Sequence, residues 1–233
     1  MSLILPRNGA GLLRRTIGAA AGGTDWTDLI SYLRMDESSG TRADQLSAVS
    51  LAEVGGTISS GTGLVYGTAT TFLKTDARYL RDNGGAAEWN NTNQFTVCMW
   101  VKPVTLTDFD GFFTSDNSNT YELLYRDSTR VRWAVAGNSQ DYSYTLTTGN
   151  WFFLVAGYDS AADKMFVSIN GAAKTEVTNT ANKNNSATTI VLGKSAAAVF
   201  CDSLIGPVAH FAAYLSDARI SDLYNAGAGR VYP

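Results

Sequence analysis

Paired carboxylates are the first chemistry to look for in this chain, because two of them flanking a glycosidic bond can hydrolyse it. Aspartates such as Asp108, Asp110, Asp116 and Asp127 occur singly in turn-like contexts, where such side chains usually satisfy backbone N–H groups. These aspartates therefore indicate turns rather than a catalytic pair. The glutamates are the other candidate carboxylates, and the chain has five of them: Glu37, Glu53, Glu88, Glu122 and Glu176.

A single histidine and two cysteines give little material for nucleophilic catalysis or for a zinc site. His210 lies between Ala209 and Phe211 in an expected late strand, with no serine or cysteine pattern of a nucleophile nearby, so a structural role is favoured. Zinc would need carboxylates for most of its ligands. Cys98 and Cys201 lie among apolar neighbours and are expected to be inert, buried thiols. A disulfide between them stays open, because it requires adjacent strands with Cα atoms about 5.5 Å apart.

Composition argues against two classes of partner. The 233 residues carry a formal net charge of -3, and no Lys/Arg run interleaves with aromatics, so nucleic acid is a poor candidate. No apolar run approaches the length of about 20 residues that a membrane span needs. The 22 glycines recur at short intervals, as a fold with many turns requires. Segments such as Gly61-Thr-Gly63 follow no phosphate-loop pattern and are read as turns.

Aromatic side chains are the remaining candidates for ligand binding. They occupy successive expected strands, and on an exposed sheet face they would form a platform for sugar rings or for a partner protein. The alternative is that Trp133 and at least one of the tyrosines fill the core, which burial statistics favour. The candidate platform consists of Tyr121, Tyr125, Trp133, Tyr142 and Tyr144.

The elements that must position these side chains are antiparallel strands. In the segment 94–103, Phe95, Val97, Met99 and Val101 alternate with Thr96, Cys98 and Trp100, which is the period of a strand with bulk on both faces. Asn170-Gly171 separates two further strands and suits a type I′ hairpin turn.

The remaining segments predict an all-β domain with one helix. Expected strands cover 28–35, 48–54, 70–74, 77–81, 110–115, 120–126, 130–136, 141–147, 151–158, 163–169, 172–177, 188–193 and 203–214. The helix covers 216–226, with Ser216 as its N-cap and Gly227 as its stop. No internal domain boundary is visible, so residues 26–233 form one domain.

Residues 1–25 are predicted to be an extended N-terminal arm. Glycines and Pro6 interrupt its apolar residues, and the segment after Arg14-Arg15 is too weakly apolar for twin-arginine export. The arm is expected either to contact a neighbouring subunit or to pack along its own domain. Its candidate assembly residues are Leu3, Ile4, Leu5, Leu12, Leu13, Arg14 and Arg15.

Taken in order, these segments resemble the laminin-G-like or concanavalin-A-like jelly-roll family, including the pentraxins, over roughly residues 29–229. Phe-Thr-Val-Cys-Met-Trp-Val-Lys-Pro looks like the family's central strand, and Trp151 to Asp159 resembles the tract in which a Trp precedes a strand and a Tyr-Asp turn. Further matches are the opening Leu-Arg-Met-Asp-Glu-Ser-Ser-Gly, the Val-Ser-Ile-Asn-Gly hairpin, Ile190 to Lys194, and Tyr214-Leu-Ser-Asp before the helix. The resemblance implies a two-sheet antiparallel jelly-roll sandwich.

The chain departs from this family at its functional positions. The pentraxin partner cysteine for Cys98 is missing from the segment 151–158. Only Asp82 and Asn83 align with part of a pentraxin calcium loop, so they are weak metal candidates and no cofactor is expected, with calcium as the alternative. No glutamate begins the Glu-x-Asp-x-x-Glu strand of the related β-glucanases. We therefore expect no enzyme activity, and a degenerate glycosidase ranks last.

Two functional hypotheses remain. The first is a structural interaction module of a larger assembly, most concretely a bacteriophage virion surface protein of the capsid or tail, acting as a homo-oligomer or with other subunits. The predicted N-terminal arm, with its apolar residues and arginines, and the lack of a recognised catalytic motif support this hypothesis. The second is an extracellular, lectin-like module that binds cell-surface glycans, with or without calcium. One protein could combine both roles, since fold alone does not specify function.

Overall fold

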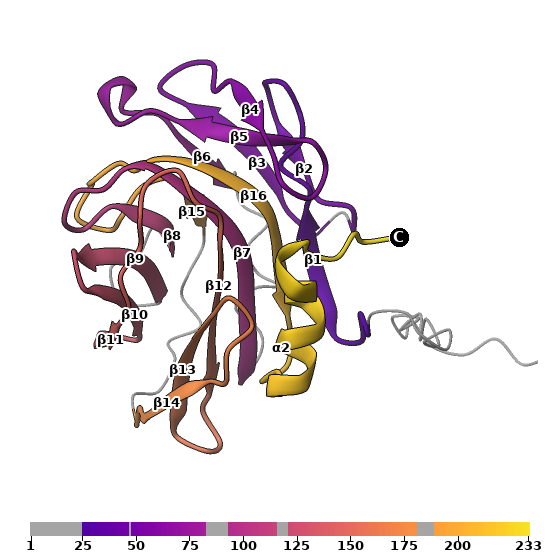
Figure 1. The fold of residues 1–233 in the computed structure, drawn as a ribbon, viewed down its shortest axis with the longest axis vertical. Coiled ribbons are helices and arrows are strands. Elements are labelled where there is room, and N and C mark those ends of the chain that lie inside the picture. Colours follow the sequence, from indigo (N-terminus) through magenta and orange to yellow (C-terminus); the bar gives the residue numbers. More distant parts are fainter. Residues whose placement is uncertain (1–24, 47, 83–92, 116–120, 181–188) are drawn as a thin grey trace, which may run out of the picture.

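The computed structural model describes residues 25–46, 48–82, 93–115, 121–180 and 189–233. These residues form two packed antiparallel sheets and one short α-helix, α2 (Asp217–Tyr224). Figure 1 shows α2 on the side of one sheet that faces away from the other sheet. The predicted two-sheet jelly-roll sandwich with one C-terminal helix is confirmed. The predicted arm lies outside the described residues, apart from Asp25.

The sheet beside α2, which we call sheet A, has eight strands. Seven follow the order β14-β13-β12-β7-β16-β5-β4, and β1 pairs with β16 beside this path. The strands are β1 (Leu29–Leu33), β4 (Ser60–Thr62), β5 (Thr68–Phe72), β7 (Gln94–Thr105), β12 (Phe152–Asp159), β13 (Lys164–Ile169), β14 (Thr175–Thr178) and β16 (Asp202–Phe211).

The opposite sheet, sheet B, also has eight strands, in the order β11-β10-β9-β8-β15-β6-β3-β2. A short 3-10 helix, η1 (Lys74–Asp76), connects β5 to β6, and a second one, η2 (Asn225–Gly227), follows α2. The strands are β2 (Arg42–Ala43), β3 (Ser50–Val54), β6 (Tyr79–Asp82), β8 (Gly111–Ser115), β9 (Tyr121–Asp127), β10 (Arg130–Val135), β11 (Asn138–Ser143) and β15 (Ile190–Leu192).

Strand β7 lies at the centre of sheet A and is buried on both faces, as its alternation predicts. Phe95, Val97 and Met99 point into the core between the sheets. Cys98 and Trp100 point to the outer side and belong to a second apolar cluster. Cys98 and Cys201 are both buried and free, so the expectation of two buried thiols is confirmed.

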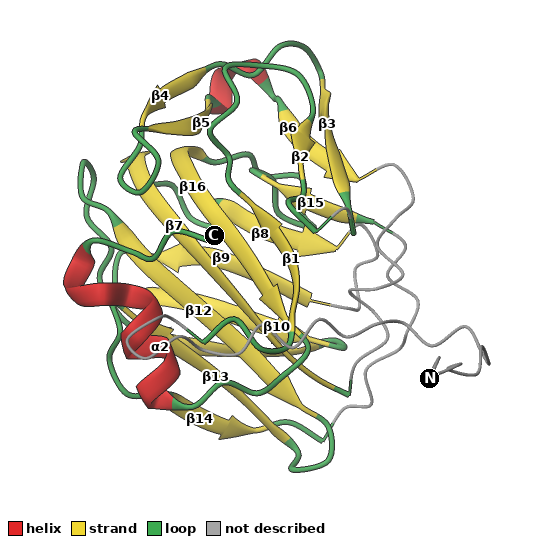
Figure 2. Cartoon of the chain, turned by 90° about the vertical axis from the view of Figure 1, so that its right-hand side faces the viewer, coloured by secondary structure: helices red, strands yellow, loops and turns green. Residues whose placement is uncertain are grey.

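That second cluster exists because α2 and the C-terminal tail cover part of the outer side of sheet A, which Figure 2 shows face on. The ring of Tyr224 in α2 stacks on Trp100 with 5.8 Å between centroids. Ile220 and Leu223 are the buried residues of the same helix. The Ser216 side chain accepts a hydrogen bond from the Arg219 N–H at 3.3 Å, which confirms the predicted N-cap.

Two glycine-containing turns set the register of the long hairpins. Asn170 and Gly171 both have positive φ, 54° and 70°, as a type I′ turn requires. Ala136 and Gly137 do the same between β10 and β11, with φ of 52° and 83°. This second turn places β11 at Asn138–Ser143, three residues earlier than the predicted segment 141–147.

Two other sequence expectations are corrected. Ser60–Thr62, read as part of a glycine-rich turn, is the edge strand β4 and pairs with β5. Helix α2 ends at Tyr224 rather than near Gly227, because Asn225 adopts the left-handed conformation and its N–H bonds to the Ser221 carbonyl.

Candidate functional site

Most of the predicted aromatic platform is core rather than surface. Trp133 is fully buried and its indole N–H donates to the Gly157 carbonyl at 3.1 Å. Tyr121, Tyr125 and Tyr142 are at most 5% exposed. The alternative that burial statistics favour, in which Trp133 and at least one tyrosine fill the core, is confirmed. These four residues form no exposed platform, because they lie on the same face of their strands as Val131 and Val135.

Tyr144, the fifth platform residue, is half-buried at the edge of the core. Its ring meets Phe152 edge to face with 6.1 Å between centroids. Its hydroxyl accepts a hydrogen bond from Asn170 Nδ2 at 3.2 Å. Tyr144 thus supports the β13–β14 hairpin and is isolated from any other exposed aromatic ring of the platform.

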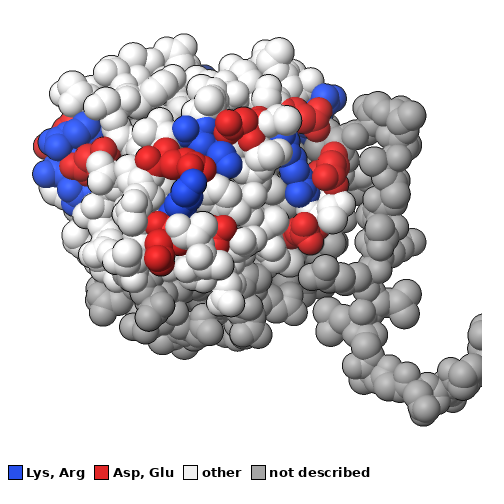
Figure 3. Space-filling model, turned by 90° about the horizontal axis from the view of Figure 1, so that it is seen from below, with Lys and Arg blue, Asp and Glu red and all other residues white. Residues whose placement is uncertain are grey.

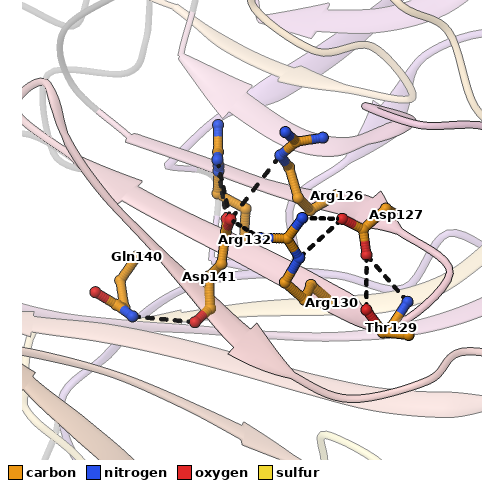
Figure 4. Close-up of polar contacts among 7 residues, drawn as sticks. All are labelled: Arg126, Asp127, Thr129, Arg130, Arg132, Gln140 and Asp141. Atoms are coloured by element: carbon orange, nitrogen blue, oxygen red, sulfur yellow. Dashed lines mark hydrogen bonds and ion pairs between the residues drawn. The ribbon is translucent and has the colours of Figure 1, made fainter.

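The same alternation that buries these rings turns charged side chains outward from sheet B. Arg126 on β9, Arg130 and Arg132 on β10, and Asp141 on β11 are all partly exposed. With Asp127 they form a connected group that we call the Arg–Asp patch (Figure 4). No helix of the described residues covers this side of sheet B, unlike the outer side of sheet A.

Asp141 is the centre of the patch. It lies opposite Arg132 in the β10–β11 register and accepts from Arg132 Nε at 2.6 Å and from its terminal nitrogen at 3.2 Å. Arg130 donates to the same carboxylate at 3.0 Å. Three guanidinium groups surround one carboxylate, because Arg126 Nε also lies 3.9 Å from Asp141 Oδ2.

The turn between β9 and β10 completes the patch. Asp127 Oδ1 accepts hydrogen bonds from the Thr129 N–H and hydroxyl, each at 3.0 Å, which is an Asx-type turn. Its other oxygen accepts from Arg130 Nε at 2.8 Å. This is the turn role that the sequence indicates for Asp127.

The electrostatics keep both carboxylates ionised. The hydrogen bond from Arg130 is the largest cause that lowers the pKa of Asp127, to about 2. The bond from Arg132 similarly lowers the pKa of Asp141 below its ordinary value. Lys, Arg, Asp and Glu side chains also stand beside one another on the molecular face in Figure 3, so no large field of one sign forms there.

An aromatic ring adjoins the patch. Phe109, in the loop between β7 and β8, is half-buried, and the guanidinium carbon of Arg126 lies 4.2 Å from its ring centroid. Phe109 has a positive φ of 69°, a strained conformation for a bulky residue. Phe109 lies in the turn that is closed by the hydrogen bond from the Asp110 N–H to the Thr107 carbonyl at 3.0 Å, and no sequence signal identifies its positive φ.

The side chain of Asp110 fixes the loop between β7 and β8. Its side chain is fully buried, and it accepts from Lys74 Nζ at 2.5 Å and from the Thr107 N–H at 2.8 Å. Burial is the largest influence on Asp110 and raises its pKa, against the lowering effect of Lys74. The Asp110 carbonyl also accepts from the Tyr125 N–H at 3.0 Å, which ties the loop to β9.

Two further half-buried rings lie together on the outer side of sheet B. Tyr79 and Phe200 have centroids 6.2 Å apart, and Lys194 Nζ lies 4.7 Å from the Tyr79 centroid. The loop that carries Phe200 crosses toward β9, where Glu122 accepts from the Ala196 N–H at 2.6 Å. Burial raises the pKa of Glu122, and this hydrogen bond occupies one of its oxygens.

A small pocket, lined mainly by apolar side chains, lies on the outer side of sheet A. It has about 280 Å³ of empty space, including open solvent, and Arg230 is its one charged residue. Arg230 is held by Asp222 through bonds of 3.0 Å and 2.7 Å. The pocket is lined by Trp26, Tyr32, Cys98, Trp100, Phe153, Pro207, Ala209, Leu223 and Arg230.

The weak metal candidates Asp82 and Asn83 stay a prediction. Asp82 is buried at the end of β6, and Asn83 lies outside the described residues. In the parts of the chain that the structure describes, no three His, Cys, Asp or Glu side chains are grouped to hold a metal ion. The same parts contain no helix long and apolar enough to cross a bilayer. His210 is buried, with its ring 5.7 Å from Phe95.

The fold is shared with binding domains of known structure. Domain 4 of AbnA, a GH43 extracellular arabinanase from Geobacillus stearothermophilus, in complex with arabinotriose, has a TM-score of 0.65 and 21% identity over 84% of this chain and 97% of that one. The binding domain of botulinum neurotoxin DC in complex with SialylT has a TM-score of 0.65 and 15% identity, covering 86% of this chain and 52% of that one.

The same neurotoxin domain in complex with rat synaptotagmin II gives a TM-score of 0.66 and 16% identity, over 85% of this chain and 51% of that one. This chain thus spans about half the length of the neurotoxin chains. At these identities the similarity establishes the fold alone. A search of curated proteins found no match.

The family is established by the sequence itself. Residues 76–222 match the Laminin_G_3 family, and this segment is more than half of the chain. The match covers the strands from β6 to β16 and most of α2, including every residue of the Arg–Asp patch. The chain belongs to the Concanavalin A-like lectin/glucanases superfamily.

Proposed function

We propose that this chain is a non-catalytic carbohydrate-binding module whose binding surface is the outer side of sheet B around the Arg–Asp patch. The carrying observation is the position of Phe109 beside a fixed array of guanidinium and carboxylate groups. Sugars offer hydroxyl groups that such planar polar groups can bind, and C–H faces that pack on aromatic rings. The array is held by its own ion pairs, so little ordering is needed on binding.

Two further observations support this function. Part of the outer side of sheet A, the other possible sheet surface, is covered by α2 and the C-terminal tail. The AbnA domain of the same fold was solved with arabinotriose. Asp127 and Asp141 do not suit the role of a general acid, because both have lowered pKa values whereas a general acid needs a raised one.

The test is a glycan array followed by calorimetric titration of the best ligand. Arg132→Ala and Phe109→Ala should each weaken binding about tenfold or more, the effect of losing one charged hydrogen bond or one stacking ring. Lys164→Ala, an exposed position on β13 in sheet A, is the matched control and should bind like the unmodified protein. Absence of binding on a broad array, or binding that neither patch variant changes, would refute the proposal. Repeating the titration with EDTA tests the calcium-assisted form, and incubation with oligosaccharides tests for hydrolysis.

For the setting of the protein, we propose an extracellular or virion-surface module, as part of a homo-oligomer or a larger assembly. The virion setting rests on the sequence of residues 1–25, which lacks an export signal, and on the lack of a recognised catalytic motif. Light scattering of the full chain and of a chain lacking residues 1–24 tests whether the arm mediates assembly. An arm-dependent oligomer would support assembly, and identical monomers would count against it.

A further inference from the structure

Arg126 differs from the other two arginines of the patch. Arg130 and Arg132 each donate hydrogen bonds to carboxylates, whereas Arg126 Nε lies 3.9 Å from Asp141 Oδ2, beyond hydrogen-bonding distance. Among the described residues, the Arg126 guanidinium donates no hydrogen bond, and its buried Nε is without a hydrogen-bond partner. The patch therefore contains one guanidinium whose hydrogen-bonding capacity is unused.

The carboxylates of the patch cannot easily supply the missing partner. Both oxygens of Asp141 already accept hydrogen bonds from Arg132, and Oδ2 accepts another from Arg130. Asp127 is occupied by Arg130 and Thr129. The neighbouring Asp108 is exposed and influences Arg130 only through its charge. Three guanidinium groups thus share two engaged carboxylates, which leaves a local excess of donors.

The position of Arg126 suits it to receive a carboxylate. Its guanidinium packs on the Phe109 ring, which limits its motion, and its side chain is 23% exposed, so solvent reaches it. A guanidinium group binds a carboxylate through two parallel N–H···O bonds, and prior fixation reduces the entropy lost on binding. A single unused arginine matches one carboxylate better than a densely sulfated chain, which needs several cations at once.

We propose that the ligand of the Arg–Asp patch is an acidic carbohydrate, with a uronic or sialic acid carboxylate bound to Arg126. This inference rests on the proposed carbohydrate-binding function and adds the substrate class. Phe109 and Arg132 contribute to binding of the sugar rings, and Arg126 provides the preference for acid over neutral sugar.

Paired ligands that differ in one charge test this inference. Oligogalacturonate is compared with its methyl ester, sialyllactose with lactose, and a sulfated oligosaccharide is included. We expect the acid of at least one pair to bind about tenfold or more tighter than its neutral counterpart, and Arg126→Gln to remove that preference. Arg126→Lys should retain part of it. Arg34→Gln is the matched control, because Arg34 also packs on an aromatic ring, with Cζ 4.3 Å from the Tyr66 centroid, but lies outside the patch.

The outcomes separate the two proposals. Equal binding of acid and neutral ligands, with sensitivity to Arg132→Ala, would overturn the acidic class and leave the carbohydrate-binding function standing. Stronger binding of the sulfated ligand would also overturn it. Failure to bind any glycan would remove both proposals. Thermal unfolding of each variant checks folding, and the Arg126→Lys variant carries the comparison if Arg126→Gln is unstable.

Discussion

Arg126 lies over the ring of Phe109, with its guanidinium carbon 4.2 Å from the ring centroid. The contact joins β9 to the loop between β7 and β8. The ion pair between Lys74 and the buried carboxylate of Asp110 holds this loop as well. The strained backbone of Phe109 persists because the contact with Arg126 and the ion pair of Asp110 hold the loop in one conformation.

Replacing Phe109 should separate the backbone strain from the contribution of the ring. Phe109→Ala and Phe109→Gly both remove the ring, but only glycine adopts a φ of 69° without penalty. We expect the glycine variant to exceed the alanine variant in free energy of unfolding by about 1 kcal/mol. Urea denaturation measures the difference. Equal stability, or a more stable alanine variant, would show that the positive φ is not a feature of the protein in solution.

The Asp141 ion pairs should stabilise the fold at neutral pH and lose this effect in acid. A carboxylate with a lowered folded pKa contributes stability above its unfolded pKa, and the contribution disappears as pH falls through the folded pKa. The free-energy difference between the unmodified protein and Asp141→Asn should be constant from pH 7 to about 5 and shrink below about 3.9. In an Arg132→Gln background this pH dependence should become smaller, since Arg132 is the largest cause of the shift. A difference that grows on acidification would contradict the assignment.

The framework could be predicted from the sequence because it depends on local patterns. The alternation of Phe95, Val97 and Met99 with Cys98 and Trp100 identifies β7 and both of its buried faces. The positive φ demanded by Asn170-Gly171 fixes a hairpin without reference to the rest of the chain. Each of these features needs only a few neighbouring residues.

The Arg–Asp patch could not be predicted because it depends on register. Alternation alone shows that Arg130 and Arg132 share a face, but the partner of Arg132 depends on the Ala136-Gly137 turn, which brings Asp141 opposite it. The aromatic platform failed for a related reason, since the rings share the phase of Val131 and Val135 and follow them into the core. Strand β4 was missed because Gly61 resembles a turn residue, although glycine is needed there: a Cβ would lie 2.8 Å from Thr71 Oγ1.

Arg42 should be the most important charged residue for stability among those outside the patch. It is fully buried, and it donates to Thr70 Oγ1 at 2.9 Å and to the Ile58 carbonyl at 3.0 Å. Arg42→Met should lower the free energy of unfolding by about 3 to 5 kcal/mol, because its acceptors and Glu53 would lose their buried partner. Arg34→Met, at a position 40% exposed, should change it by less than about 1 kcal/mol. Similar losses for the two variants in urea denaturation would contradict the buried role of Arg42.

The two cysteines should react only when the protein unfolds. Burial raises the pKa of both thiols, and Cys98 lies beneath α2 whereas Cys201 lies between the sheets. We expect no labelling by a thiol reagent in native buffer, two labelled thiols in denaturant, and no disulfide after mild oxidation. Mass spectrometry measures all three. An intramolecular disulfide in the native protein would contradict the placement of Cys98 and Cys201 in two different apolar clusters, on opposite sides of sheet A.

Gly171 should tolerate substitution less well than Gly137, although both have positive φ and both follow another residue of positive φ in a turn between two strands. A Cβ at Gly171 would lie 2.7 Å from Tyr224 Cδ1, whereas a Cβ at Gly137 would meet nothing within 4 Å. Gly137→Ala should therefore cost about 1 kcal/mol, for the positive φ alone. Gly171→Ala should cost a further 1 to 3 kcal/mol or so, because the new methyl group overpacks the contact between the hairpin and α2. Urea denaturation measures both, and adding Tyr224→Ala should recover part of the Gly171→Ala loss only. Equal costs at the two glycines would mean that α2 does not pack on this hairpin in solution.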